Sequence, residues 1–176
     1  MTSNVRDVTY WKLSELSYKS DILKNQMIIH KDIKEEWEVI DQKSIKGTGF
    51  DAVVFKRENN IVIAYRGTEG SDPLRGGFKD IVNDLRYIVL KQKERLNRFP
   101  NQFDDGLDYA KEVKEKYPKA EITLTGHSLG GGIATFVAAM TDLEAVTYSA
   151  PTVGSKGTVL LLLFIENWNH LLNHLL

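Results

Sequence analysis

One stretch constrains this chain more than any other. From Glu121 to Met140 it runs E-I-T-L-T-G-H-S-L-G-G-G-I-A-T-F-V-A-A-M. It begins with alternating apolar residues, turns sharply at a G-x-S-x-G sequence, and continues as a glycine- and alanine-rich segment with helical character. Strand, G-x-S-x-G and helix in this order are the context of a nucleophile elbow, a tight turn that holds its serine in a strained backbone conformation with the hydroxyl directed outward.

The residues of this turn have separate expected roles. A Cβ two positions before or after the serine would collide with the crossing strand and helix, so we predict structural roles for Gly126 and Gly130. Ser128 is then the candidate nucleophile. The alternative is a glycine loop that matches the motif by chance, and the flanking strand and small-residue helix weigh against it.

Length and composition indicate one ordinary globular domain. The chain has 176 residues, of which 42% are hydrophobic and 27% are charged, which is enough for a single domain with a real core. The formal net charge of -1 gives no reason to expect nucleic acid as a partner. Because there are no cysteines, a disulfide framework and a thiol nucleophile are both excluded.

Targeting signals are not evident in the sequence. The first ten residues lack the apolar core of a secretory signal. The longest apolar run, Val159 to Ile165, is far shorter than the ~20 residues that span a bilayer. We therefore expect no transmembrane segment and, by default, a cytoplasmic protein, with export by a route without a cleaved signal left open.

Apolar periodicity predicts alternating strands and helices. Spacing in residues 4–27 fits one or two amphipathic helices with a break at Ser20-Asp21. Because strands alternate with helices over residues 50–150, we predict an α/β fold with a mostly parallel sheet and helices on both faces. The predicted strands are 37–40, 50–55, 61–65, 122–124 and 145–148, and the predicted helices after residue 50 are 78–91, 103–117 and the segment after the elbow.

Three motifs in this order resemble one known family. They are Ile63 to Thr68, an apolar strand ending in R-G-T; Gly126 to Gly132, the elbow; and Tyr148 to Gly154, with the sequence Y-S-A-P-T-V-G. Phe78 to Leu85 is a fourth and weaker match. Together they resemble the class 3 lipases, the fungal lipase-like branch of the α/β-hydrolases, over roughly residues 50–157.

The resemblance implies a catalytic arrangement. Ser128 would be the nucleophile, and the oxyanion donors would be the backbone N–H groups of Leu129 and of Thr68, the residue after R-G. For Thr68, a turn hydroxyl is the alternative. His127 is structural in the family, because side chains next to an elbow serine point away from its Oγ. The substrate would be an acyl ester such as a glyceride, phospholipid or small carboxylester, with no metal or cofactor. A lipid–water interface is a possible partner, and partner proteins stay unknown.

Two further interpretations concern the loop after the R-G-T motif. The glycine-rich segment from Glu69 to Phe78 is a candidate flap beside the oxyanion position, and its basic Arg75 and Lys79 would favour anionic head groups. Arg66 is interpreted as an anchoring side chain, with Asp80 or Asp84 as its expected partner.

The sequence departs from the family pattern after Gly154. In α/β-hydrolases the triad order is Ser, then Asp or Glu, then His. The last aspartate, Asp142, precedes the Y-S-A-P-T-V-G motif, so it is in the wrong place. The remaining residues offer only Glu166 with His170 or His174. Glu166 and His170 are neighbours at i and i+4 on a helix, and they are weak triad candidates.

The tail is rich in Leu, Asn and His, unlike continued hydrolase sequence. We predict a class 3 lipase-like domain over 1–157, with 1–46 mainly helical, and an atypical tail over 158–176. The C-terminal strands and triad region are expected to be missing, through a shifted frame or truncated gene. The tail could instead be a short amphipathic helix that covers the sheet edge or binds a membrane surface.

Two functions from different classes follow from the sequence. The first is a serine ester hydrolase that works through an acyl-enzyme on Ser128, with a thioester or amide substrate as a weaker variant. The second is a catalytically inactive, truncated hydrolase domain without the Asp and His of a triad, retained as a binding module or produced by a damaged gene.

Overall fold

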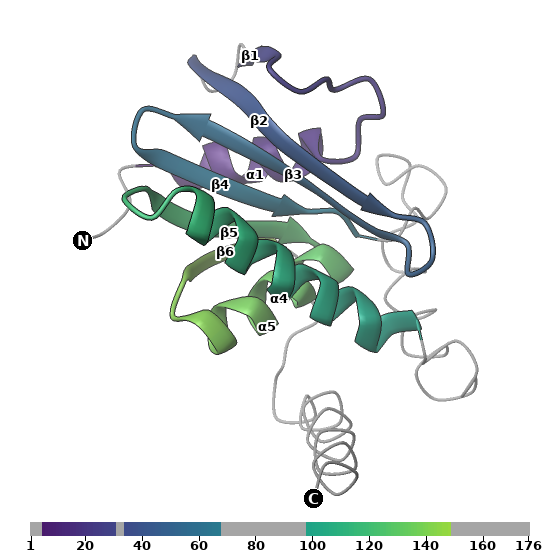
Figure 1. Ribbon diagram of the computed structural model, residues 1–176. Coiled ribbons are helices and arrows are strands. Elements are labelled where there is room, and N and C mark those ends of the chain that lie inside the picture. The colour runs from purple at the N-terminus through teal and green to yellow at the C-terminus, as the bar shows by residue number, and fades with distance from the viewer. Residues whose placement is uncertain (1–4, 31–33, 68–97, 149–176) are drawn as a thin grey trace, which may run out of the picture.

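The computed structural model describes residues 5–30, 34–67 and 98–148, which form one sheet with helices on both faces (Figure 1). The six described strands lie in the order β1-β2-β3-β4-β5-β6. Their bounds are β1 Met27–His30, β2 Glu35–Ile45, β3 Phe50–Arg57, β4 Asn60–Tyr65, β5 Glu121–His127 and β6 Glu144–Tyr148. The helices are α1 Asp7–Leu16, α4 Arg98–Lys116 and α5 Leu129–Thr141.

Strand direction changes across the sheet. The strands β1 to β4 form antiparallel pairs in succession. From β4 onward the pairs are parallel, with Tyr65 opposite Gly126 and His127 opposite Tyr148. Short turns join β2 to β3 and β3 to β4, whereas the parallel pair β5 and β6 needs the crossover helix α5. The predicted α/β fold with helices on both faces of the sheet is thus confirmed. The described sheet is mixed, however, where we predicted a mostly parallel one.

The N-terminal part differs from the prediction of a mainly helical segment over 1–46. Its described residues, 5–30 and 34–46, contain the helix α1, followed by turns through Ser20-Asp21 and then by the strands β1 and β2. Only a short strand at 37–40 was predicted here. The physical reason is that β2 carries charged and polar side chains along much of its length, so its apolar pattern is confined to a few central positions.

Two hydrophobic layers enclose the sheet (Figure 1). On one face α4 and α5 pack through Val113, Ile133 and Val137 against Ile63 and Leu124. On the other face α1 packs on alternate residues of the same strands. The buried members of that second layer include Leu13, Trp37, Phe55, Val62 and Ala64. The apolar run of β4 is therefore buried on both faces, as its sequence predicts.

Among the described residues, no helix is long and apolar enough to cross a membrane.

Candidate functional site

The elbow lies at the carboxyl end of β5, where α5 begins one residue later. Ser128 has φ 56° and ψ -124°, a positive-φ conformation that is strained for a residue with a side chain. Its N–H donates to the carbonyl of Tyr148 at 3.2 Å, and its carbonyl accepts from the Gly132 N–H at 3.1 Å. The serine is thus held between the end of the sheet and the first turn of the helix, and it is 6% exposed.

Close backbone packing explains the two glycines of the turn. A Cβ on Gly126 would lie within 3.0 Å of backbone atoms of Gly130 and Gly131. A Cβ on Gly130 would lie equally close to the carbonyl of Tyr65 at the end of β4. Real Cβ atoms essentially never approach other atoms so closely. The elbow therefore excludes side chains at the two positions that the sequence motif reserves for glycine.

The residues that follow β4 pack against the elbow. Arg66 and Gly67 follow Tyr65 directly, and the Gly67 N–H donates to the Tyr18 hydroxyl at 2.9 Å. That hydroxyl in turn donates to the carbonyl of His127 at 3.3 Å. A Cβ on Gly67 would lie 2.5 Å from the Tyr18 hydroxyl and 2.8 Å from the His127 carbonyl. The glycine of the R-G-T motif is thus required by a close approach between β4, β5 and the turn after α1.

His127 lies on the α1 face of the sheet, opposite the layer formed by α4 and α5. Its ring packs edge-on against Trp11, with centroids 5.7 Å apart, and against Tyr18 at 6.5 Å. Burial lowers the pKa of His127, and the nearby Glu15 carboxylate only partly opposes this effect. The imidazole is therefore neutral at pH 7.

Leu129 is the first residue of α5 and is buried. Its N–H belongs to the first turn of the helix, whose N–H groups have no partner within the helix and carry the positive end of the helix dipole. This arrangement can stabilise negative charge that develops next to Ser128.

Several predicted residues lie outside the described residues. They are Thr68, the candidate flap 69–78 with Arg75, Lys79, Asp80 and Asp84, the predicted helix 78–91, the motif residues from Ser149 to Gly154, and the tail with Glu166, His170 and His174. Of the candidate site, the structure places Gly126 to Gly130 and brings them against Arg66 and Gly67. Arg66 is half-buried, with its guanidinium carbon 5.7 Å from the centroid of the Tyr18 ring.

Asp142 is far from the elbow. It follows α5 in a left-handed conformation with φ 58° and precedes β6. Because β6 starts opposite Thr123 and reaches the elbow only at Tyr148, Asp142, which precedes β6, lies beyond the end of the strand that is remote from Ser128. The sequence-based argument that Asp142 is misplaced for a triad agrees with this position.

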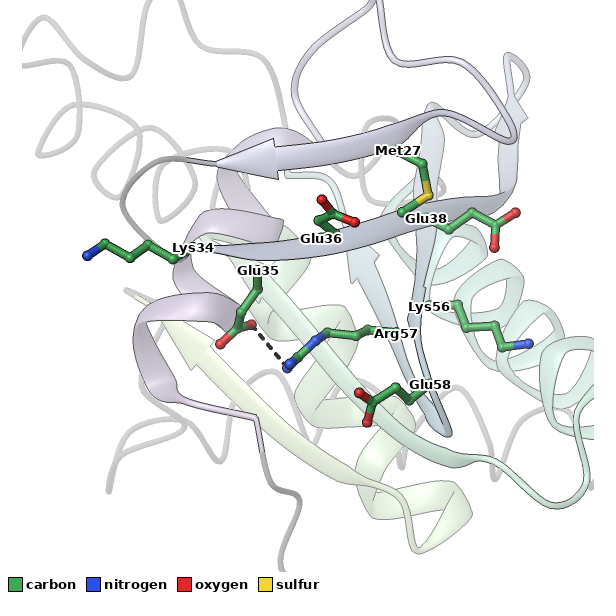
Figure 2. A pocket seen from close by; sticks show the side chains of 8 residues that line it. All are labelled: Met27, Lys34, Glu35, Glu36, Glu38, Lys56, Arg57 and Glu58. Atoms are coloured by element: carbon green, nitrogen blue, oxygen red, sulfur yellow. Dashed lines mark ion pairs between the residues drawn. The ribbon is translucent and has the colours of Figure 1, made fainter.

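A separate depression lies at the other end of the sheet. It has a volume of about 580 Å³ and is lined by Met27, Lys34, Glu35, Glu36, Glu38, Lys56, Arg57 and Glu58. Figure 2 shows the charged side chains around it and the ion pair between Glu35 and Arg57. The β3–β4 turn beside it is at the amino end of β5, whereas Ser128 follows the carboxyl end. This depression is therefore not part of the elbow site.

Within the described ranges, no group of three or more His, Cys, Asp or Glu side chains is placed to hold a metal ion.

Comparison with known proteins decides the family. A family model described as "Phospholipase-like: Tle-like phospholipase domain" matches residues 13–155, a span that includes the elbow and all six described strands. The chain belongs to the Tle-like phospholipase family. It is a lipase- or phospholipase-like hydrolase domain, and the resemblance to the fungal lipase-like family is confirmed.

Relatives of this phospholipase-like domain are similar over parts of their length. The inferred lipase ATG15 of Eremothecium gossypii is 44% identical over 59 residues, which are 34% of this chain and 11% of the relative. An extracellular phospholipase A1 from Serratia liquefaciens is 29% identical over 107 residues, which are 61% of this chain and 29% of the relative.

The fold has a close counterpart among solved structures. The Lip2 lipase from Yarrowia lipolytica superposes with a TM-score of 0.59 at 19% identity, covering 82% of this chain and 58% of that chain. The domain thus spans less than two thirds of the length of each of these proteins.

Sequence reasoning missed Tyr18 as a part of the site. It is separated from Gly67 by 49 residues and from His127 by 109. Its amphipathic surroundings in the sequence indicated only helix packing. No local sequence pattern indicates that a tyrosine in a turn will contact an R-G-T motif. The contact arises only when the chain folds.

Proposed function

We propose that this phospholipase-like domain is a serine ester hydrolase in which Ser128 attacks the carbonyl carbon of an acyl ester. The observation that carries the proposal is the positive-φ conformation of Ser128 at the carboxyl end of β5, between two glycines whose backbones leave no room for a side chain. Such strain persists only where the surrounding structure holds it, and it clusters at functional sites.

The proposed chemistry is acyl transfer in two steps. The Ser128 oxygen forms a bond to the acyl carbon while a general base takes its proton, and the proton then passes to the leaving alcohol. Water next attacks the acyl-enzyme and releases the carboxylic acid. The N–H of Leu129 would donate to the oxyanion, and Thr68 is the predicted second donor. His127 would be structural, because its neutral ring packs in the α1 layer between Trp11 and Tyr18.

Glu166 and His170 are the triad candidates of this chain, with His170 as the general base and Glu166 as the carboxylate that would pair with it. If they complete the site, His170→Ala should lower kcat on a soluble ester by at least about 100-fold, since general base catalysis typically contributes 10²–10⁴. His174→Ala is the matched control from the same tail. Equal kcat values for His170→Ala and the wild type would remove His170 from the mechanism.

A lipid is the proposed natural substrate class. The support is the phospholipase description of the family model, together with the names of a lipase and a phospholipase A1 among the relatives. A phospholipid or glyceride supplies the acyl ester that this chemistry needs.

Ester turnover by the purified chain tests the proposal. Wild type, Ser128→Ala and Ser44→Ala would be compared on p-nitrophenyl butyrate and on phosphatidylcholine vesicles, with fatty acid release as the second readout. Ser44 is an exposed serine on β2 and serves as the matched control. We expect turnover by wild type and Ser44→Ala, and loss of at least about 10³-fold in Ser128→Ala. Equal rates in wild type and Ser128→Ala would contradict the proposal and favour an inactive domain.

A further inference from the structure

The Tyr18 hydroxyl joins two backbone segments that are remote in the sequence. It accepts a hydrogen bond from the Gly67 N–H at 2.9 Å and is 3.3 Å from the His127 carbonyl, to which it donates. A phenol has one proton to donate and lone pairs to accept with, so a single hydroxyl can satisfy both backbone groups. Tyr18 thus bridges the residue after Arg66 and the residue before Ser128.

The surroundings of Tyr18 fix this hydroxyl in place. The Arg66 guanidinium lies over the ring, with its central carbon 5.7 Å from the ring centroid, which is within the range of a cation–π contact. The His127 ring packs against Tyr18 with centroids 6.5 Å apart. Gly67 fits only because it has no Cβ, since one would lie 2.5 Å from the hydroxyl. The contact is therefore closely packed from three sides.

The phenol keeps its proton in this environment. Burial raises the pKa of Tyr18, while the hydrogen bond from Gly67 and the charge of Arg66 act in the opposite direction without reversing it. Tyr18 is consequently neutral at pH 7, and the hydroxyl remains able to donate to the His127 carbonyl.

We propose that Tyr18 is a positioning residue for acyl transfer, because its hydroxyl sets the spacing between the end of β4 and the elbow. This inference rests on the proposed function of Ser128. The N–H of Leu129 and the hydroxyl of Ser128 belong to the elbow side of this bridge, whereas Gly67 at the exit of β4 lies on the other side. The position of Ser128 and of the Leu129 N–H relative to the end of β4 therefore depends on Tyr18.

Phenylalanine at position 18 keeps the ring and removes only the bridge. The ring contacts with Arg66 and His127 are retained, but the Gly67 N–H and the His127 carbonyl each lose a partner. Displacement of catalytic groups by about 1 Å can cost on the order of 10²-fold in rate. Because the oxyanion exists only after attack, the loss falls on kcat, with little change in KM.

Steady-state kinetics of Tyr18→Phe and Tyr109→Phe in the full chain test the inference. Tyr109 is the matched control, because it is a buried tyrosine of the α4 layer whose hydroxyl bridges no backbone groups among the described residues. Rates on p-nitrophenyl butyrate would be expressed per site titrated with a fluorophosphonate. We expect kcat to fall about 10- to 100-fold in Tyr18→Phe with KM within about twofold, and Tyr109→Phe to keep kcat within about twofold.

The outcomes separate this inference from the proposed function. Active wild type with unchanged kcat in Tyr18→Phe would overturn the positioning role alone. An equal fall of kcat in Tyr109→Phe would overturn it as well. Wild type no faster than Ser128→Ala would overturn the proposed function and this role with it. If Tyr18→Phe does not fold, amide exchange in the wild type decides. A protected Gly67 amide is expected, and exchange at the rate of an unfolded chain would overturn the bridge.

Discussion

At the scale of single residues, the elbow stores strain at one position and removes side chains at two others. The backbone of Ser128, with φ 56°, costs on the order of 1–3 kcal/mol relative to a relaxed conformation. Hydrogen bonds to Tyr148 and from Gly132 hold it there, together with the contact of Gly130 against the Tyr65 carbonyl. The conformation of the serine is thus a property of its neighbours.

Substitution of Gly130 should therefore be costly. Gly130→Ala places a methyl group against backbone atoms of Tyr65 and Arg66. These atoms cannot shift aside as the end of a flexible side chain could. We expect it to lower the free energy of unfolding by about 2–3 kcal/mol or more, the upper part of the range for overpacking. Chemical denaturation monitored by circular dichroism measures this change.

Gly47→Ala is the control for that measurement, because a Cβ at Gly47 would meet nothing within 4 Å. It should change the free energy of unfolding by no more than about 0.5 kcal/mol. Similar losses for Gly47→Ala and Gly130→Ala would contradict the packing account of the elbow.

The sequence predicts the residues within the elbow better than the residues around it. Gly126, Ser128 and Gly130 follow from a local motif, since a tight strand-to-helix turn makes the same demand wherever it occurs. Tyr18 cannot be predicted in this way, because its partners are far away in the sequence: Gly67 follows β4, and His127 ends β5.

At the scale of elements, α1 connects the N-terminal segment to the site. It covers the face of the sheet opposite α4 and α5 (Figure 1). The turn that follows α1 carries Tyr18. Trp11 of α1 contacts both His127 and Tyr148, with ring centroids 5.7 Å and 5.1 Å apart. The stability of this layer and the geometry of the elbow are consequently coupled.

The contribution of the α1 layer to stability can be tested by creating a cavity beneath α1. Leu13 is 0% exposed in the α1 core, and we expect Leu13→Ala to lower the free energy of unfolding by about 2–5 kcal/mol. Leu23, in the turn that follows, is 69% exposed, and Leu23→Ala should have an effect within about 0.5 kcal/mol. Thermal unfolding of both variants makes the comparison. Equal melting temperatures for the two would show that α1 is not a stabilising layer.

Elements with a clear apolar pattern were predicted well, and those without one were not. The buried strands β4 and β5 and the helices α4 and α5 match their sequence signals to within a few residues. The strand β1 has four residues, too few for a recognisable alternation, and β2 is far longer than the predicted strand at 37–40 because its pairing with β3 extends through polar positions.

At the scale of the whole molecule, one carboxylate ties α1 to the sheet at the end remote from Ser128. Glu35 accepts hydrogen bonds from Arg6, Thr9 and Trp37 at 3.0 to 3.2 Å, and Arg57 lies 3.8 Å away. Burial alone would raise the pKa of Glu35, but these donors and charges outweigh it, and the pKa is lowered. The ion pair with Arg57 is visible at the rim of the depression in Figure 2.

The Glu35 carboxylate makes the free energy of unfolding depend on pH in a predictable direction. Because the folded pKa is lowered, the contribution of Glu35 is fully present above its ordinary value of 4.5 and is lost as the pH falls through the folded value. At pH 7 we expect Glu35→Gln to lower the free energy of unfolding by about 1–2 kcal/mol. The difference from wild type should shrink steadily below pH 4.5.

Glu36→Gln is the control, since Glu36 is the exposed neighbour on β2. It should show little difference from wild type at any pH, as expected of surface charges. Urea titrations at pH 7 and pH 3 measure both variants. A Glu35→Gln deficit that is as large at pH 3 as at pH 7 would contradict the assigned role of the carboxylate.

The central claim is that Ser128 is a nucleophile, and covalent labelling tests it most directly. The purified chain would be treated with a fluorophosphonate, digested and mapped by mass spectrometry, with Ser128→Ala and Ser44→Ala treated in parallel. We predict a single adduct on the peptide that contains Ser128, in wild type and Ser44→Ala and not in Ser128→Ala. An unmodified Ser128 peptide in the wild type, or an adduct that persists in Ser128→Ala, would contradict the claim.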